Sequence, residues 1–189
     1  INATSYYGNN VSGDSIHIRC NGESNGSAIV NLGGGTYPYT FSWEDASGAV
    51  VSTNQITDTI LSAGTHIVTV IDAQNCEATM NVTLVEPDVL VVNGTSTGAS
   101  SAFPGGFDIS CKGLNDGECY TNADGGVKFT GGYYQYDWSG ALNGQVSNDT
   151  LITDLYAGTY SVIVEDFNGC LNSQTFILTE PTDYFIAET

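Results

Sequence analysis

The chain has 189 residues, of which 21 are Asp or Glu and only 3 are Lys or Arg, so its formal net charge is -18. Nucleic acid and anionic membrane surfaces are disfavoured as partners, because both are bound by clustered Lys and Arg, whereas here Arg19, Lys112 and Lys128 are scattered. Hydrophobic residues make up 41% of the chain, which is enough to build a folded core.

The composition indicates an all-β protein, since 23 Gly and 11 Tyr accompany abundant Ser, Thr and Asn. No run of about 18 apolar residues is present, so we expect no direct membrane insertion. The first residues lack the basic and apolar regions of a signal peptide, and we interpret the chain as a piece of a longer protein.

Strand patterns follow one another along the first half of the chain. Tyr39, Phe41 and Trp43 alternate with polar residues, which predicts a strand with one buried face. Two further strands are predicted over residues 67–70 and 80–84, with glycine-containing turns between the strands. Six or seven such strands in about 90 residues are typical of a β-sandwich.

The second half of the chain repeats the first. Each copy contains, in order, a Cys-x-Gly turn, a Gly-Gly pair before an aromatic strand, an Ala-Gly-Thr strand start, a second Cys and a Glu-Pro pair. The matching segments are residues 20–22 with 111–113, 34–43 with 131–138, 63–72 with 157–166, Cys76 with Cys170, and Glu86-Pro87 with Glu180-Pro181. The offset between matching cysteines grows from 91 to 94 residues, so the second copy carries a short insertion, which we place near residues 118–124.

The duplication predicts two tandem immunoglobulin-like β-sandwich repeats, residues 1–87 and residues 88–181. Residues 182–189 are interpreted as the start of a following repeat or as a tail. Residues 183–186 stand where residues 89–92 open the second copy, and Ile1 matches the end of the same element. The positions of the two chain ends within the repeat favour a piece cut from a longer array.

These residues resemble the SprB repeat. The combined signature is Cys-x-Gly-x-x-x-Gly, Gly-Gly-x-x-Pro-Tyr-x-x-x-Trp, Ala-Gly-Thr, a Val-rich strand, Asp, a second Cys and Glu-Pro, and the second copy lacks the Pro before Tyr134. The resemblance covers nearly all of the first copy and most of the second. It implies a segment of the very large surface adhesins of gliding Bacteroidetes, which the type IX secretion system exports, and it implies no ligand-contacting residue.

Matching positions predict two disulfides within the repeats, Cys20 with Cys76 and Cys111 with Cys170. Closing loops of this size would stabilise each repeat by roughly 4 kcal/mol, and disulfides would place the protein outside the cytoplasm. Two alternatives remain open. The thiols are free and buried, or Cys119, in the predicted insertion, pairs with Cys111 and leaves Cys170 free.

The surplus of carboxylates suggests Ca²⁺ as a cofactor, because this ion takes about six to eight oxygen ligands and needs no His. The candidate ligands are Glu86 and Asp88 at the joint between the repeats, Asp72 and Asp166 before the last Cys, and Asp116, Glu118 and Asp124 around the insertion. None of them forms an EF-hand loop. The alternative is that these side chains accept hydrogen bonds from the backbone of their own turns.

Two pairs of adjacent tyrosines are candidates for stacking on sugars, Tyr133-Tyr134 beside the insertion and Tyr6-Tyr7 near the start. Adjacent residues of a strand point to opposite faces, so both members of a pair cannot face the core. The alternative is that these aromatics are core or shielding residues.

An enzyme is not expected, because His17 and His66 stand alone, Asp108 and Tyr160 occupy the matching places, and no nucleophile motif accompanies them. We expect instead a non-enzymatic segment of a secreted adhesin on the outer bacterial surface, which gives length, stiffness and multivalent adhesion in gliding motility. The expected partners are neighbouring repeats of the same chain and a surface polysaccharide or abiotic substratum. The alternative function is a carbohydrate-binding module that uses the insertion of the second copy.

Overall fold

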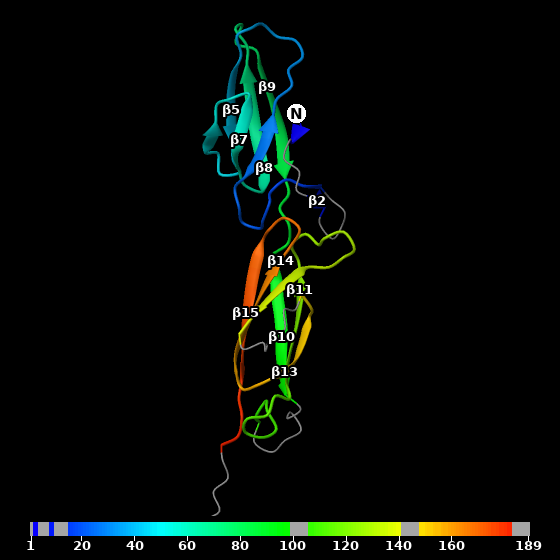
Figure 1. The fold of residues 1–189 in the computed structure, drawn as a ribbon. Coiled ribbons are helices and arrows are strands. Elements are labelled where there is room, and N and C mark those ends of the chain that lie inside the picture. Colours follow the sequence, from blue (N-terminus) through cyan, green and yellow to red (C-terminus); the bar gives the residue numbers. More distant parts are fainter. Residues whose placement is uncertain (1, 4–7, 10–14, 99–105, 141–147, 183–189) are drawn as a thin grey trace, which may run out of the picture. The chain divides into compact units, whose positions relative to one another are not determined.

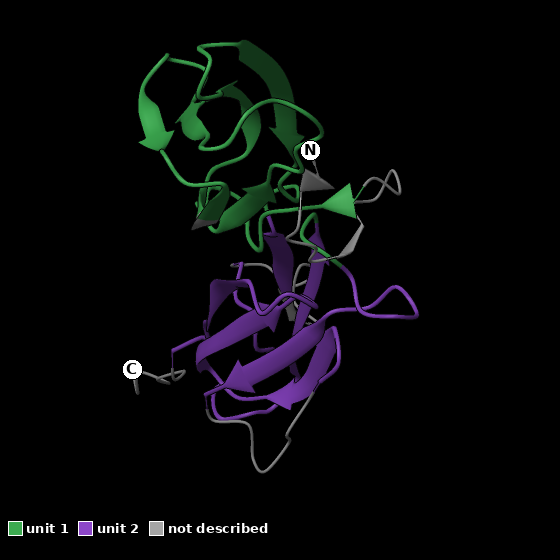
Figure 2. Ribbon diagram, turned by 90° about the horizontal axis from the view of Figure 1, so that it is seen from above, with its two compact units in different colours: residues 1–89, 125–127 green, residues 90–124, 128–189 purple. Residues whose placement is uncertain are grey.

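The computed structural model describes residues 2–3, 8–9, 15–98, 106–140 and 148–182. The chain forms two compact units (Figure 2), residues 1–89 with 125–127 and residues 90–124 with 128–189. We call them repeat 1 and repeat 2. Every regular element among the described residues is a β-strand, so the all-β prediction is confirmed. The same residues contain no helix of the length and apolarity that a membrane span requires.

Repeat 1 is a sandwich of two antiparallel sheets (Figure 1), with the strand orders β1-β4-β7 and β6-β5-β8-β9. The strands are β1 (Asn2–Ala3), β4 (Gly26–Ile29), β5 (Thr40–Glu44), β6 (Val50–Ser52), β7 (Ile56–Leu61), β8 (Gly64–Ile71) and β9 (Glu77–Leu84). A two-stranded hairpin of β2 (Gly8–Asn9) and β3 (Ser15–Ile16) precedes β4. The strand orders separate the A, B and E positions of an immunoglobulin-like sandwich from the C, F and G positions.

Repeat 2 has the same arrangement, with the strand orders β10-β11-β13 and β12-β14-β15. Its strands are β10 (Val91–Gly98), β11 (Gly117–Asp124), β12 (Gln135–Ser139), β13 (Leu151–Leu155), β14 (Gly158–Glu165) and β15 (Leu171–Leu178). The last two strands pair along their whole length, from Gly158 opposite Leu178 to Glu165 opposite Leu171. The hairpin of β8 and β9 in repeat 1 is paired in the same way.

The two cores are built from matching residues. Trp43 is fully buried in repeat 1, and Trp138 takes its place in repeat 2, where its ring centroid lies 5.5 Å from that of Phe176. Each indole N–H donates to a main-chain carbonyl, that of Asn54 or that of Asp149. Further buried pairs are Ile18 and Ile109, Leu61 and Leu155, Val68 and Val162, Val70 and Val164, and Leu84 and Leu178. Each such aliphatic side chain stabilises the fold by about 1.5–3 kcal/mol when buried.

A hydrogen bond between the start of β8 or β14 and the turn before it is a further mark of the fold. The buried Tyr160 donates its hydroxyl to the carbonyl of Tyr156 at 2.9 Å. This is the tyrosine corner of immunoglobulin-like sandwiches. In repeat 1 the buried His66 stands at the same place, and its Nε2 lies 3.0 Å from the carbonyl oxygen of Ser62. The strand orders and these corners confirm the immunoglobulin-like prediction.

The predicted insertion near residues 118–124 coincides with a strand of repeat 2. Residues 118–124 belong to β11 and pair with β10 and β13. Gly26 lies opposite Leu61 and Gly117 lies opposite Leu155, so β4 and β11 begin in the same register. Because β11 has eight residues and β4 has four, the strand of repeat 2 extends beyond that of repeat 1, and the insertion near residues 118–124 stays a prediction.

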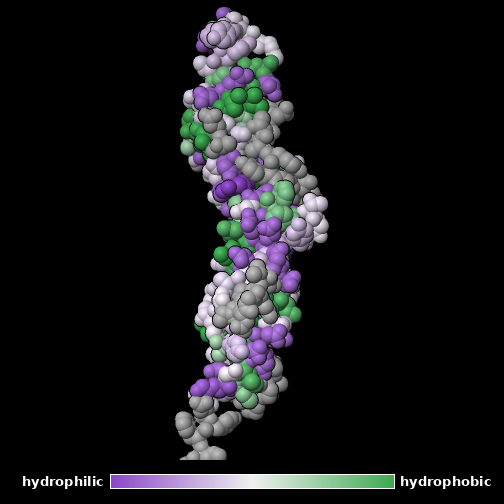
Figure 3. Space-filling view, viewed as in Figure 1, coloured by the Kyte–Doolittle hydropathy of each residue, from purple (hydrophilic) through white to green (hydrophobic). Residues whose placement is uncertain are grey.

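Hydrophobic residues on the surface are dispersed. On the face seen in Figure 3, they form small patches between hydrophilic residues. The outward positions of β8 and β14 contribute single apolar side chains such as Ile67 and Ile163. Scattered exposure of this kind is ordinary for a folded domain, so these strand faces offer no obvious binding site.

Candidate functional site

The end of each repeat that carries Glu-Pro is closed by a turn at the first cysteine; we call it the trailing end. In repeat 1 the turn covers residues 20–23, and Gly22 has a φ of +78°, which glycine adopts at little cost. Glu86 Oε2 accepts a hydrogen bond from the Gly22 N–H at 2.7 Å. The side-chain amide of Asn21 donates to the carbonyl of Pro87 at 2.9 Å. The Cys-x-Gly and Glu-Pro parts of the signature thus hold each other in place.

Two contacts at the trailing end of repeat 1 recur in repeat 2. The Gly113 N–H donates to Glu180 Oε2 at 2.7 Å. Asp116 Oδ1 accepts a hydrogen bond from the Ser110 N–H at 3.1 Å, as Asn25 does from the matching N–H in repeat 1. Hydrogen bonding from Ser110 lowers the pKa of Asp116 below its usual range. These polar side chains thus accept hydrogen bonds from the backbone of the turn.

His17 belongs to the same end and has a structural role. Its Nδ1 accepts a hydrogen bond from the Val85 N–H at 3.2 Å. Asp108 occupies the matching place in repeat 2 and accepts from the Thr179 N–H at 2.8 Å. Burial lowers the pKa of His17, which favours the neutral ring that can accept this bond.

The opposite end of each repeat holds the turn between the last two strands and the last cysteine; we call it the leading end. In repeat 1 Asp72 Oδ1 accepts hydrogen bonds from the N–H groups of Gln74 and Cys76, both at 2.9 Å. Its Oδ2 accepts from the Thr36 N–H, also at 2.9 Å. These bonds hold the pKa of Asp72 below its usual range, and the bond from the Cys76 N–H has the largest effect.

The leading end of repeat 2 has the same turn. Asp166 Oδ1 accepts hydrogen bonds from the N–H groups of Asn168 at 2.8 Å and Cys170 at 2.9 Å. The side-chain amide of Asn172 donates to the carbonyl of Leu90 at 2.7 Å. Because Leu90 directly precedes β10, the last cysteine of repeat 2 lies at the end where the chain enters that repeat.

The cysteines differ from the predicted pairing. Cys20 and Cys170 are disulfide-bonded, whereas Cys76, Cys111 and Cys119 carry free thiols. The predicted pairs Cys20–Cys76 and Cys111–Cys170 are therefore wrong, and so are the two alternatives. The physical reason is distance, because the first and last cysteines of a repeat lie at opposite ends of an eight-residue strand, β9 or β15. Such a strand spans about 27 Å, whereas a disulfide needs Cα atoms within about 7 Å.

Cys119 is a core residue rather than part of a loop. It lies fully buried on β11, at the position that Ala28 holds on β4. Burial raises the pKa of its thiol to about 12. The thiol therefore stays protonated and unreactive in the folded repeat.

The candidate calcium ligands do not converge. Glu118 and Asp124 lie at opposite ends of the same eight-residue strand, β11. The carboxylates of Glu86 and Asp116 accept the backbone hydrogen bonds described above, and Asp88 is exposed at the joint. Within the described residues, no three His, Cys, Asp or Glu side chains gather as a metal site would require. The calcium site stays a prediction.

The two tyrosines proposed to contact sugars differ in exposure. Tyr133 is 52% exposed and stacks on Phe129, with ring centroids 5.4 Å apart and an interplanar angle of 11°. Phe167, itself exposed, meets Phe129 edge-on at 5.7 Å. Tyr134 is buried, its pKa is raised to about 12 chiefly by burial, and Lys128 Nζ lies 5.5 Å from its ring. The exposed aromatic surface is thus formed by Phe129, Tyr133 and Phe167, without Tyr134. Tyr6 and Tyr7 lie outside the described residues.

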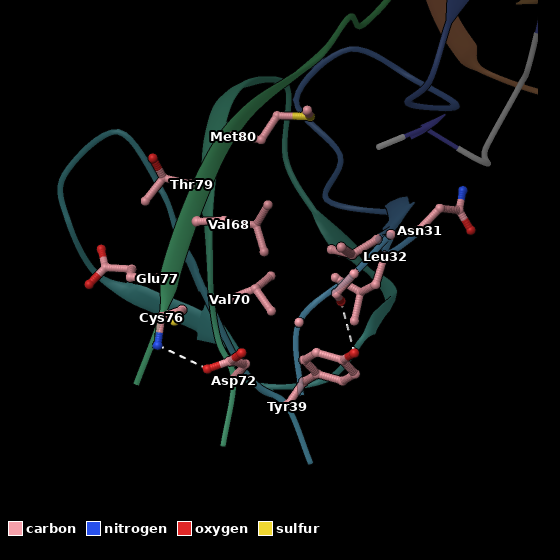
Figure 4. Close-up of a pocket in the computed structure, with 15 residues that line it drawn as sticks. Asn31, Leu32, Tyr39, Val68, Val70, Asp72, Cys76, Glu77, Thr79 and Met80 are labelled. Atoms are coloured by element: carbon pink, nitrogen blue, oxygen red, sulfur yellow. Dashed lines mark hydrogen bonds between the residues drawn. The ribbon is translucent and has the colours of Figure 1, made fainter. Parts of the chain in front are cut away.

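A groove of about 360 Å³ opens at the leading end of repeat 1 (Figure 4). Val68 and Val70 line it together with Leu32 and Met80, and the Tyr39 hydroxyl donates to the carbonyl of Gly34 at 3.0 Å. Cys76 and Asp72 also line the groove, close to each other in Figure 4. Because both oxygens of Asp72 accept backbone hydrogen bonds, the groove offers an apolar surface rather than a carboxylate poised for acid–base chemistry.

The fold and its turns define a protein built from tandem immunoglobulin-like β-sandwich repeats. The SprB repeat family matches residues 17–48, which include the first turn, β4 and Trp43. The predicted resemblance is confirmed, and SprB repeats are repeats of cell-surface adhesins rather than an enzyme family.

No curated protein matches the chain. One similar solved structure contains three N-terminal domains of the bacteriophage RB49 highly immunogenic outer capsid protein, Hoc, at 19% sequence identity and a TM-score of 0.48. The similarity covers 87% of this chain and 57% of the Hoc chain, so the chain spans little more than half of that structure.

Proposed function

We propose that the chain is a non-enzymatic repeat segment of a secreted bacterial surface adhesin that takes part in gliding motility. The observation that carries this proposal is the SprB repeat match at residues 17–48. The turn contacts support its extension to repeat 2, because Gly113 and Glu180 reproduce the bond between Gly22 and Glu86. Such repeats supply length and stiffness, and many weak contacts along one filament add up to firm attachment.

The charge of the chain suits this role. A net charge of -18 in two repeats makes neighbouring filaments repel one another. Repulsion between successive repeats also favours an extended chain. The proposed partners are neighbouring repeats of the same protein and a polysaccharide or abiotic substratum.

Adhesion of beads that carry the chain at increasing density tests the proposal. Attachment to glass or to a polysaccharide film should rise more steeply than in proportion to density, because contacts made by one bead reinforce each other. Attachment proportional to density, or none at any density, would argue against a multivalent adhesin. In the source cells, antibody against the chain should label intact cells, and deletion of the gene should stop surface spreading.

A glycan-binding module is the second candidate, favoured by the exposed aromatic surface of Phe129, Tyr133 and Phe167. Aromatic platforms of this kind bury the apolar faces of sugar rings. If a glycan array shows saturable binding, the double variant Tyr133→Ala and Phe167→Ala should abolish it. The control is Tyr120→Ala, which removes an exposed tyrosine from β11. Equal loss in the control, or no loss in the double variant, would remove this candidate.

A further inference from the structure

The two exposed free cysteines, Cys76 and Cys111, stand at positions whose counterparts are oxidised. Cys170 matches Cys76 and Cys20 matches Cys111, and both counterparts are disulfide-bonded. The turns around Cys76 and Cys170 are held by the same hydrogen bonds, in which the cysteine N–H donates to Asp72 or Asp166. Each position of the repeat therefore has a geometry that accommodates a disulfide.

The first and last cysteines of one repeat are too far apart to bond with each other. The other cysteine of repeat 1 is free when Cys20 is bonded, and the same holds for repeat 2 and Cys170. The length of β9 and β15 explains this, because it separates the first and last cysteines by about 27 Å.

The two cysteines of a repeat face opposite ways along the chain. The first cysteine lies at the trailing end, beside the Glu-Pro pair through which the chain leaves the repeat. The last lies at the leading end, where Asn172 contacts Leu90 just before β10. In an array, the trailing end of one repeat is thus followed along the chain by the leading end of the next, so a first cysteine and a last cysteine flank each joint.

We propose that Cys111 forms a disulfide with the last cysteine of a following repeat and that Cys76 forms one with the first cysteine of a preceding repeat. The inference rests on the proposed array of repeats. Each bond would cross the joint beside a Glu-Pro pair and limit bending and pulling apart there. Cys119 is excluded, because it is buried in the core and has Ala28 as its counterpart.

Cys76 lies beside an apolar groove of repeat 1. Cys76 is exposed, whereas its counterpart Cys170 is only 9% exposed. Asp166 is likewise fully buried, while its counterpart Asp72 is partly exposed. The apolar groove beside Cys76 is lined by Leu32 and Met80 (Figure 4) and gives the trailing end of a preceding repeat a surface to pack against.

The oxidation needs a disulfide oxidant. The thiolate of one cysteine attacks a low-molecular-weight disulfide such as oxidised glutathione and releases one glutathione thiol. The second cysteine then attacks the mixed disulfide and releases the other. Two electrons and two protons pass from the protein thiols to the oxidant, which leaves as two thiols.

A fusion of two chains tests the proposal, with residues 1–185 of the first copy followed directly by residues 1–189 of the second. This joint keeps the natural spacing, since residues 181–185 and Ile1 match residues 87–91 and Val92. An inner variant carries Cys76→Ser in the first copy and Cys111→Ser in the second, which leaves the cysteines that flank the new joint. The matched outer variant carries the reverse substitutions and keeps only the two cysteines at the far ends.

Both variants are equilibrated with reduced and oxidised glutathione, then denatured, alkylated without reduction and mapped by peptide mass. In the inner variant, the proposal expects a peptide linking Cys111 to Cys76 in a monomeric chain, with neither residue alkylated. In the outer variant both thiols should be alkylated. Alkylation of both residues in both variants, or equal cross-linking in both, would overturn the proposal provided that circular dichroism shows folded β structure.

If the inner variant does not fold, the fusion without cysteine substitutions is used instead, and the linked peptide is sought in it directly. There, absence of the linked peptide overturns the proposal. The outcome is separable from the proposed function, because the fusion supplies its own flanking repeats. A source gene without further repeats would overturn the array while leaving the result of the fusion intact.

Discussion

The carboxylate of Glu86 accepts a hydrogen bond of 2.7 Å from the backbone N–H of Gly22, 64 residues away in the sequence. The bond ties the end of the last strand of repeat 1 to its first turn. Glu180 and Gly113 make the same bond in repeat 2. Two signature elements that are far apart in sequence therefore form a single structural contact.

Replacing Glu86 by alanine should lower the free energy of unfolding of repeat 1 by about 1 kcal/mol, because an N–H of the turn loses its charged acceptor. Urea denaturation followed by tryptophan fluorescence measures this, since each repeat contains one Trp. Glu77→Ala, at the other end of β9, is the control and should leave the midpoint unchanged. Equal effects of the two substitutions would contradict the assigned role of Glu86.

His66→Tyr should stabilise repeat 1 by about 1 kcal/mol. His66 Nδ1 is buried without a hydrogen-bond partner, and a phenol would remove this polar atom while keeping the bond to the carbonyl of Ser62. Repeat 2 supplies the template, in which Tyr160 bonds to Tyr156. The reciprocal Tyr160→His should lower the melting temperature of repeat 2. A fall in both variants would indicate that each pocket is shaped for its own ring.

Acid should weaken the leading end of repeat 1 through Asp72. The hydrogen bonds from Cys76 and Thr36 lower its pKa in the folded state, so the ionised form is favoured by folding. This contribution is fully present above the unfolded pKa of about 3.9 and is lost as the pH falls through the folded pKa.

Asp72→Asn should therefore be less stable than the parent at pH 6, and the difference in melting temperature should shrink as the pH is lowered toward 2. Thermal unfolding at a series of pH values measures the difference. Glu77→Gln, at a nearby exposed carboxylate on the first residue of β9, serves as the control. A difference that stays constant with pH would show that ionisation of Asp72 does not contribute.

Cys119 should react with a maleimide only when repeat 2 unfolds, whereas Cys76 and Cys111 should react in the folded chain. With a pKa of about 12, the thiolate fraction of Cys119 at pH 8 is about 10⁻⁴. Mass spectrometry after timed labelling assigns each site. Cys119→Ala, which copies Ala28 of repeat 1, should cost about 1 kcal/mol and remove only the slow site. Rapid labelling of Cys119 would show that its part of the core opens readily.

EDTA tests the calcium prediction. We expect no fall in melting temperature, because the carboxylates of Glu86 and Asp116 are engaged by backbone N–H groups. A fall that added Ca²⁺ reverses would instead support a calcium site. In that case, comparing Asp88→Asn with Asp124→Asn would show whether calcium binds at the joint between the repeats or at the end of β11.

Much of the fold is visible in the sequence because periodicity and repetition both report on it. The alternation of Tyr39, Phe41 and Trp43 predicts β5, and the matching Trp138 predicts its partner in repeat 2. The duplication also shows which residues are equivalent. It does not show which residues are close together, and this is why equivalent cysteines suggested the wrong disulfides.

Two local features depend on more than the sequence pattern. The sequence does not fix the insertion because a gap between two aligned copies can slide along a segment of weak similarity, and the pairing of Gly117 with Leu155 fixes only where β11 begins. Tyr133 and Tyr134 are both candidates from the sequence, and which of the two neighbours is buried depends on which face the sheet presents to the core. The Phe129–Tyr133 stack and the groove beside Cys76 bring together side chains from loops whose shape the sequence pattern does not specify.

The bond between Glu86 and Gly22 begins and ends within one repeat, as does the bond between Glu180 and Gly113. A gene segment that is duplicated or lost in register therefore adds or removes a complete set of these contacts and leaves none half-made. Unequal recombination between copies can then change the length of the encoded chain without creating a misfolded unit. The reach of the protein is in this way open to selection by copy number alone, independently of the sequence of any single repeat.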